Sequence, residues 1–164
     1  FELVQVAEPI FTNAGLLGRA FHARWLCGEA LRLMKNNQSA RQILQKTLDD
    51  SNNNFIPQIT LRCHTSLGLL EKNAENFAGA KKHFEQAVAI VEEMRAPLPA
   101  EDFRMSFLAD KLTPYQELMN LYLESEGEDG IKKAFVLAEN ARSRVLLEML
   151  DYNFSALELS ESRQ

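Results

Sequence analysis

A cysteine and a histidine stand side by side at Cys63 and His64, and such a pair can generate a nucleophilic thiolate when the two side chains meet. The apolar residues around them recur with a helical period, and adjacent residues on a helix do not face each other. We therefore expect a buried cysteine beside a partly exposed histidine. A small enzyme is kept as a third alternative, which loss of a hydrolytic activity in Cys63→Ala would support.

The other groups that could do chemistry lack the required spacing. The histidines and cysteines form neither an HxxxH nor a CxxC pattern, which are spacings that metal sites use. Gly15 and Gly18 lie in helical sequence and do not belong to a GxGxxG or P-loop motif, whose backbone N–H groups bind a phosphate. We predict no catalytic residue, no metal and no cofactor. The histidines and cysteines considered are His22, His64, His83, Cys27 and Cys63.

The bulk composition is that of one globular domain. The chain has 164 residues, of which 46% are hydrophobic and 25% charged, which is enough to bury a core. Its net charge of -5 disfavours nucleic acid or an anionic membrane surface as the main partner. The acidic groups at Glu92–Glu93 and within residues 126–129 are expected to be solvated, because nothing in the pattern would separate their pKa values.

Targeting signals are not recognisable in the sequence. No apolar run reaches the roughly 18 residues that a membrane span needs. Phe1–Ile10 has neither the basic start nor the cleavage site of a signal peptide, and without an initiator Met we expect a piece of a longer protein. Cys27 and Cys63 are too few for a disulfide framework, so we expect reduced thiols in the cytoplasm.

Apolar residues recur with a helical period along the whole chain, so the predicted fold class is all-α. Asn13 is expected to cap a helix that runs to about Lys35. Asn36–Asn37 then breaks the pattern, and a second helix spans about Ser39–Leu48. The polar stretch Asp49–Asn54 is predicted to be a loop, because its side chains compete for backbone hydrogen bonds.

Prolines mark the next boundaries. Pro57 suits the first turn of a third helix, which stops near Asn73. A fourth helix is predicted from about Phe77 to just before Pro97.

The last third of the chain is predicted to hold two more helices. The fifth helix covers residues 99–124, with a kink at Pro114 because proline removes a backbone hydrogen bond. Residues 126–130 form a turn, and the sixth helix continues through Leu150. Residues 151–164 are expected to be a frayed tail or the lead-in to another domain.

One spacing recurs three times along these helices. A first residue is followed after twelve residues by an alanine, then four residues later by a second core position and three later by a third. The middle copy is the clearest. The copies are Gly28, Ala40, Leu44 and Thr47; Gly68, Ala80, Phe84 and Ala87; and Tyr122, Ala134, Ala138 and Ala141.

This skeleton resembles the tetratricopeptide (TPR) pattern, in which antiparallel helix hairpins stack into an α-solenoid that usually binds other proteins. Small residues let helix backbones approach, so Ala80 is expected against Gly68, with Phe84 filling the space beside them. The repeat-like units are expected at about residues 14–50, 55–96 and 99–150, within one domain that spans residues 1–164.

From Asp102 the sequence becomes more specific. Residues 103–111 read FRMSFLADK and lead to Tyr115, and residues 134–150 read AFVLAENARSRVLLEML. This text resembles the helical region that precedes the CHAT domain, a caspase-like domain found behind TPR repeats in many bacterial proteins. The resemblance implies an arm that binds partners or regulates an adjoining protease. The catalytic groups of such a protease would lie in the downstream domain, so we expect no peptidase activity here.

In a TPR unit the first helix of each pair lines a concave groove, and Trp25 lies on such a helix. It is either a groove contact, since tryptophan is frequent at binding hot spots, or a packing residue, which is the commoner role of a large aromatic side chain. The basic-plus-asparagine set that clamps a peptide carboxylate is not recognisable, so a chaperone tail is not the predicted ligand. Arg142 and Arg144 are either docking residues for an adjoining domain or solvent-facing charge. The predicted groove residues are His22, Trp25, Glu29, Arg32, Arg62, Thr65, Leu69, Lys72 and Asn73.

The sequence therefore predicts a non-catalytic interaction module that binds a protein, a peptide or its own downstream domain. The alternative is a stand-alone TPR adaptor or oligomerisation scaffold with no protease attached. Light scattering would distinguish the two, because a truncated solenoid exposes an apolar end face. Neither nucleic acid nor a membrane is expected as a partner.

Overall fold

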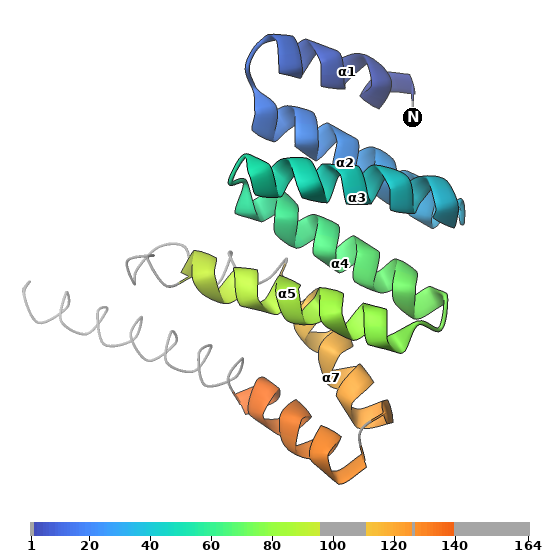
Figure 1. Ribbon diagram of the computed structural model, residues 1–164, viewed down its shortest axis with the longest axis vertical. Coiled ribbons are helices and arrows are strands. Elements are labelled where there is room, and N and C mark those ends of the chain that lie inside the picture. The colour runs from blue at the N-terminus through green and yellow to red at the C-terminus, as the bar shows by residue number, and fades with distance from the viewer. Residues whose placement is uncertain (1, 96–110, 126, 140–164) are drawn as a thin grey trace, which may run out of the picture. The chain divides into compact units, whose positions relative to one another are not determined.

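The computed structural model describes residues 2–95, 111–125 and 127–139, and each of these residues lies in an α-helix or in a short connection next to one (Figure 1). The all-α class predicted from the sequence is confirmed over this part of the chain. The chain divides into two compact units, Phe1–Val91 and Glu92–Gln164, which are described separately. The helices are α1 (Glu2–Asn13), α2 (Leu17–Leu33), α3 (Asn37–Asn53), α4 (Pro57–Asn73), α5 (Phe77–Arg95) and α7 (Thr113–Ser125), and residues 127–139 are also helical.

In the first unit the helices follow each other at a fixed interval. The helices α2, α3, α4 and α5 begin at residues 17, 37, 57 and 77, and a three-residue connection precedes each of them. Consecutive helices run in opposite directions (Figure 1). The pair formed by α2 and α3 is thus followed, at the same spacing, by the pair formed by α4 and α5.

The four connections share one backbone conformation, in which the middle residue is left-handed. In the second connection the Lys35 N–H donates to the Arg32 carbonyl at 3.0 Å, and the Asn36 N–H donates to the Leu31 carbonyl at 2.9 Å. These bonds satisfy carbonyls that the end of α2 leaves unpaired. The left-handed residues are Gly15 (φ 71°), Lys35 (60°), Phe55 (53°) and Glu75 (59°).

The connections before α3 and α5 also provide an asparagine cap. Asn36 Oδ1 accepts a hydrogen bond from the Ser39 backbone N–H at 3.4 Å, and Asn76 Oδ1 accepts one from the Gly79 N–H at 3.2 Å. The helix α4 instead begins with Pro57, as predicted, where the missing N–H costs no helical hydrogen bond.

Two glycines of the first unit are covered by a large side chain of the next helix. A Cβ atom at Gly28 would lie 2.6 Å from Leu44 Cδ2, and one at Gly68 would lie 2.5 Å from Phe84 Cε1. A side chain at either position would therefore have to displace its neighbour. A close approach is present at Gly68, but the nearest atoms belong to the Phe84 ring and not to Ala80, the predicted partner, which is fully buried. The core around these contacts includes Ala20, Phe21, Cys27, Leu31, Ala40, Leu44, Leu48, Ile59, Cys63, Leu67 and Leu70.

The helix α2 lies at the centre of this packing. It contacts α1, α3 and α4, and α3 also contacts α4. Although they are separated in sequence by α3, α2 and α4 are thus direct neighbours (Figure 1). Side chains at equivalent positions of these two helices can therefore lie close together.

The second unit has its own buried residues. Tyr115, Leu118 and Leu121 of α7 are buried, and the Tyr115 hydroxyl donates to Glu92 Oε1 at 2.5 Å. Ala134, the small residue of the third sequence copy, is 5% exposed. Two acidic residues in the helix over residues 127–139 pair within that helix, Glu128 with Lys132 at 3.2 Å and Asp129 with Lys133 at 2.7 Å.

The first helix boundary differs from the prediction. Residues 2–13 form α1, and Asn13 is its last residue rather than the cap of the next helix. The helix α2 begins only at Leu17 and has Leu16 as its cap residue. The reason is Gly15, whose φ of 71° provides the left-handed turn that ends a helix.

The loop predicted at Asp49–Asn54 is also wrong. The helix α3 starts at Asn37 and continues through Asn53, so this polar stretch forms its last turns. Ser51 is buried there, and its Oγ lies 3.0 Å from Thr60 Oγ1 of α4. Packing against the next helix thus outweighs the weak helix propensity of the polar residues.

The long fifth helix predicted over residues 99–124 is not continuous at residues 111–112, and residues 99–110 lie outside the described residues. The helix α7 begins at Thr113, and residues 111–112 precede it outside any helix. Pro114 is therefore in the first turn, where a proline disturbs no helical hydrogen bond.

The turn predicted at residues 126–130 is wrong over residues 127–130, and residue 126 lies outside the described residues. Residues 127–130 are already helical, and Gly127 has a left-handed φ of 55°. The predicted sixth helix is present over residues 127–139. Its remainder through Leu150 and the tail at 151–164 lie outside the described residues.

Candidate partner-binding site

The predicted groove residues fall in two rows on neighbouring helices. Within each row the residues are mostly three or four positions apart, which places them on one face of a helix. The helices α2 and α4 are in contact, and Trp25 of one row meets Arg62 of the other. The row on α2 is His22, Trp25, Glu29 and Arg32, and the row on α4 is Arg62, Thr65, Leu69, Lys72 and Asn73.

Trp25 joins the two rows. Its indole Nε1–H donates to Ser66 Oγ on α4 at 3.0 Å, and the guanidinium carbon of Arg62 lies 4.8 Å from a Trp25 ring centroid. That distance is within the range of a cation–π contact. Ser66 Oγ in turn donates to the Arg62 carbonyl at 2.9 Å. Trp25 is only partly buried and packs against the hydrophobic core, so it is both a packing residue and part of the surface.

His22 lies one turn before Trp25, with 5.4 Å between the two ring centroids. Burial lowers the pKa of His22, and the charge of Arg62 lowers it further. The imidazole is therefore mostly neutral at pH 7 and can both donate and accept a hydrogen bond.

The remaining residues of the two rows are polar, charged or aliphatic. Arg32 and Glu29 pair within α2, with 2.8 Å between Nη2 and Oε2. The Thr65 hydroxyl donates to the Leu61 carbonyl at 2.9 Å, so its polar group is used within α4. Leu69 and Lys72 are half-buried, and Asn73 is exposed at the end of α4.

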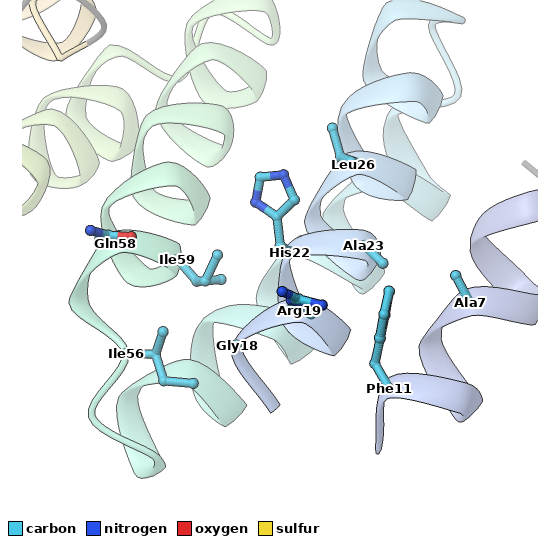
Figure 2. Close-up of a pocket in the computed structure, with 10 residues that line it drawn as sticks. All are labelled: Ala7, Phe11, Gly18, Arg19, His22, Ala23, Leu26, Ile56, Gln58 and Ile59. Atoms are coloured by element: carbon cyan, nitrogen blue, oxygen red, sulfur yellow. The ribbon is translucent and has the colours of Figure 1, made fainter. Parts of the chain in front are cut away.

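A cavity of about 560 Å³ lies beside α2, with α1 on one side and the start of α4 on the other (Figure 2). We call it the α2 trough. Of the predicted groove residues, His22 lines it; the other lining residues were not predicted, because they come from three helices whose packing the sequence pattern did not reveal. The lining residues are Ala7, Phe11, Gly18, Arg19, His22, Ala23, Leu26, Ile56, Gln58 and Ile59.

His64 and His83 form a pair that their spacing in the sequence did not predict. Their Nδ1 atoms are 3.0 Å apart, from α4 and α5 respectively. Burial lowers the pKa of His64 to about 4, with a further contribution from the charge of His83, and burial also lowers the pKa of His83. Among the residues that the structure describes, no three metal-binding side chains come together. The pair is a hydrogen-bonded contact between two helices.

Cys63 does not have the properties of a catalytic nucleophile. It is fully buried, and burial raises the pKa of its thiol to about 12, so the reactive thiolate is scarce at neutral pH. Its neighbour His64 is only partly buried and is engaged with His83. The expected buried cysteine beside a partly exposed histidine is confirmed.

Arg24 fixes the position of α2 between its neighbours. Its Nε donates to Glu8 Oε1 of α1 at 2.8 Å, and its Nη1 pairs with Asp50 of α3. The guanidinium pKa is raised by these two carboxylates against the opposing effect of burial. One side chain thus ties α1, α2 and α3 together.

Arg142 and Arg144, the predicted docking residues, lie outside the described residues. No protein-family model matches the chain, and no curated protein or solved structure is significantly similar to it. Over the described ranges, each helix is too short or too polar to span a lipid bilayer.

Proposed function

We propose that this chain is a non-catalytic protein-interaction module, built as a short TPR-like solenoid, that binds a protein or peptide across α2 and α4. The observation that carries the proposal is a contact that recurs from one helix pair to the next. Gly28 meets Leu44 as Gly68 meets Phe84. Hairpins that repeat one contact stack with their first helices side by side, and this stacking creates an extended face for another polypeptide.

The side chains on that face suit a binding surface. Trp25, Arg62 and His22 form a cluster in which the Arg62 guanidinium lies over the Trp25 ring and the His22 ring, 5.4 Å away between centroids, is tilted against it by 43°. Tryptophan and arginine are the residue types that most often dominate binding energies at protein interfaces. Cys63, the one nucleophile considered, is buried below this face as a protonated thiol.

The proposal extends to an adjoining protease-like domain and a cytoplasmic setting. The resemblance of residues 102–150 to the region before CHAT domains supports the first part, with Arg142 and Arg144 as docking residues. The two buried free cysteines suit a reducing compartment. A parent reading frame that continues into a caspase-like segment would support the domain arrangement, and one that does not would contradict it.

Affinity capture with the purified chain tests the binding face. Arg32→Glu reverses a charge beside Glu29, and Leu69→Glu places a charge in the row on α4. Both positions are partly exposed, so we expect both variants to fold, which circular dichroism checks. Lys46→Glu on the exposed side of α3 is the matched control. We expect capture to be lost with the two face variants and kept with Lys46→Glu. Equal capture by all of them would contradict the proposal. Trp25→Ala is unsuitable alone, because it also removes a packed ring.

A second candidate function is self-assembly, as in an oligomerisation scaffold. The observation that favours it is exposed apolar surface near α1: Val6 is 62%, Ile10 59% and Leu26 44% exposed. Such surface is unusual on a monomer when it is contiguous. Light scattering at increasing protein concentration separates the candidates, since the scaffold requires a rise in mass that the binding module does not.

A further inference from the structure

Two imidazole nitrogens face each other between α4 and α5. His64 Nδ1 and His83 Nδ1 are 3.0 Å apart, and the ring centroids are 5.2 Å apart with an interplanar angle of 48°. The rings therefore meet at their Nδ1 edges and are not stacked. Two nitrogen ligands of one transition-metal ion, each about 2.0–2.1 Å from it, lie about 2.8–3.4 Å apart. The two Nδ1 atoms are thus already at the separation that a shared ion requires.

The helix pair holds the two histidines in this position. His64 lies one turn before Gly68 on α4, and His83 directly precedes Phe84 on α5, whose ring covers Gly68. That contact keeps the two helices close together, and both histidines belong to the first compact unit. Ligands on packed helices are positioned more precisely than ligands on loops. Both nitrogens can therefore reach one ion with little rearrangement.

The packing of a helix pair does not itself require two histidines. The helices α2 and α4 begin at residues 17 and 57, and at this offset the equivalents of His64 and His83 are Arg24 and Ile43. Arg24 is engaged with carboxylates of α1 and α3. The same two positions thus hold residues that bind no metal in the preceding pair, so the histidine pair is a feature that α4 and α5 add to the repeated packing.

Both imidazoles can supply a lone pair to an ion. In the hydrogen-bonded pair one Nδ1 carries a proton and the other Nδ1 accepts the hydrogen bond. When both nitrogens bind an ion, that proton moves through solvent to Nε2 of the same ring, so no net proton is released. Both rings are partly exposed, which gives water and the ion access. Burial lowers the pKa of both histidines, so the neutral form, which binds metals, prevails at neutral pH.

The surrounding charges and the ligand type select a class of ion. Near His83 the Glu71 carboxylate favours a cation, while Lys82 and Arg41 oppose it. Glu71 is itself held by Arg41 and Asn76. The affinity must therefore come from the imidazoles, which suit Zn²⁺, Cu²⁺ and Ni²⁺ and not Mg²⁺ or Ca²⁺. Over the described residues no third histidine, cysteine or carboxylate joins the pair, so water completes the coordination shell.

We propose that His64 and His83 together bind a divalent transition-metal ion, with Zn²⁺ as the type case, through their Nδ1 atoms. The ion links α4 to α5, so its binding stabilises the folded chain. This site goes beyond the proposed function, because it requires no protein partner. The two histidines are 19 residues apart on different helices, which is why they form no short metal motif in the sequence.

Zinc binding to the untagged full chain tests this proposal. The probe is zinc chloride, titrated by isothermal calorimetry at neutral pH, and thermal unfolding is compared in Zn²⁺ and in Mg²⁺. We expect one ion per chain and a higher melting temperature in Zn²⁺ alone. His64→Gln and His83→Gln each leave a single imidazole, so each should weaken binding by about tenfold or more and remove the rise in melting temperature. His22→Gln, the matched control outside the pair, should stay within about twofold of the wild type.

Copper identifies the ligands independently of affinity. The electron paramagnetic resonance spectrum of bound Cu²⁺ reports its nitrogen ligands, which should fall from two in the wild type to one in His64→Gln or His83→Gln. Circular dichroism without metal checks that the variants fold, and His83→Gln is sufficient if His64→Gln does not.

Several results would overturn the metal site. They are absence of zinc binding to the wild type, binding that is equally strong in both pair variants, and a Cu²⁺ spectrum that the variants leave unchanged. A rise in mass by light scattering on addition of Zn²⁺ would place the ion between two chains and overturn the site within one chain as well.

Discussion

The Phe84 ring of α5 lies so close to Gly68 of α4 that a Cβ atom at residue 68 would be 2.5 Å from Phe84 Cε1. Leu44 stands in the same relation to Gly28, at 2.6 Å. The large residue differs between the two sites, while the glycine is kept at the same place in each helix pair. The absence of a side chain on the first helix is therefore the shared requirement of both contacts.

Gly68→Ala should lower the free energy of unfolding by about 1–3 kcal/mol, because the new methyl group overpacks against Phe84. The gain in helix propensity, about 1 kcal/mol, is too small to compensate. Gly18→Ala is the control, since its methyl group meets nothing, and it should keep or raise stability, by up to about 0.5 kcal/mol in the first turn of α2. Urea unfolding measures both. A gain in stability for both variants would contradict the close contact at Gly68.

The recurring core positions were visible in the sequence because they are local to each hairpin. Gly68, Ala80 and Phe84 lie on two successive helices, and their types follow from the packing of those helices against each other. The helical ending of α3 was not visible, because it depends on the contact of Ser51 with Thr60 on another helix. Local propensity favoured a loop there, and tertiary packing prevailed.

The candidate site was predictable in part for the same reason. The two rows on α2 and α4 follow from helical spacing, which placed Trp25 and Arg62 correctly as neighbours of one surface. The α2 trough needed α1, whose residues Ala7 and Phe11 form one wall. The pairing of His64 with His83 depends on how α5 is rotated against α4, which apolar periodicity does not specify.

Phe55→Gly should stabilise the protein. Phe55 has a left-handed φ of 53° and is 90% exposed, so the substitution relieves backbone strain and loses little packing. After subtraction of the extra entropy of glycine in the unfolded chain, the expected gain is about 0.5–1 kcal/mol. Met34→Gly is the matched control, because Met34 is 73% exposed but has a φ of -77°. Met34→Gly should lower the free energy of unfolding by a similar amount. Thermal unfolding of the two variants checks the opposite signs.

Stability should fall as the pH drops from about 6.5 towards 4. His64 has a pKa of about 4 in the folded protein, below the usual 6.5, so in this window the unfolded chain binds a proton that the folded protein excludes. Unfolding then takes up protons, which makes stability rise with pH by about 1–3 kcal/mol across the window. His83 faces it from α5, near Glu71, Lys82 and Arg41.

His64→Gln checks the source of this pH dependence. Glutamine keeps a hydrogen-bonding side chain but does not titrate, so the difference in stability between pH 6.5 and pH 4.5 should shrink. Burial lowers the imidazole pKa of His22 at another site. The variant His22→Gln should therefore remove only the smaller part of the pH dependence of stability that His22 causes. A slope that is unchanged in His64→Gln would show that the pair does not control it.

Removing one partner of the ion pair between Glu71 and Arg41 should lower the free energy of unfolding by an amount that depends on which partner is removed. Glu71 of α4 pairs with Arg41 of α3, and the side chains are 10% and 44% exposed respectively. Glu71 Oε2 also accepts from Asn76 Nδ2 at 2.7 Å. Arg41→Leu leaves a buried carboxylate without its cation and should cost about 1–3 kcal/mol. Glu71→Leu leaves an arginine that water can solvate, and it introduces the residue type found at the equivalent position of α2, Leu31, so it should stay within about 1 kcal/mol of the wild type.

The pH dependence of Arg41→Leu identifies the carboxylate as the cause. The hydrogen bond from Arg41 is the main reason why the pKa of Glu71 lies below its usual value, ahead of the opposing effect of burial. Without Arg41, burial should raise that pKa. Glu71 then protonates as the pH falls, and the cost of Arg41→Leu relative to the wild type should shrink below about pH 5. Glu71→Leu has no such group and should show no recovery. Urea unfolding at pH 7 and pH 4.5 measures this, and equal costs for Arg41→Leu at both pH values would contradict the assignment.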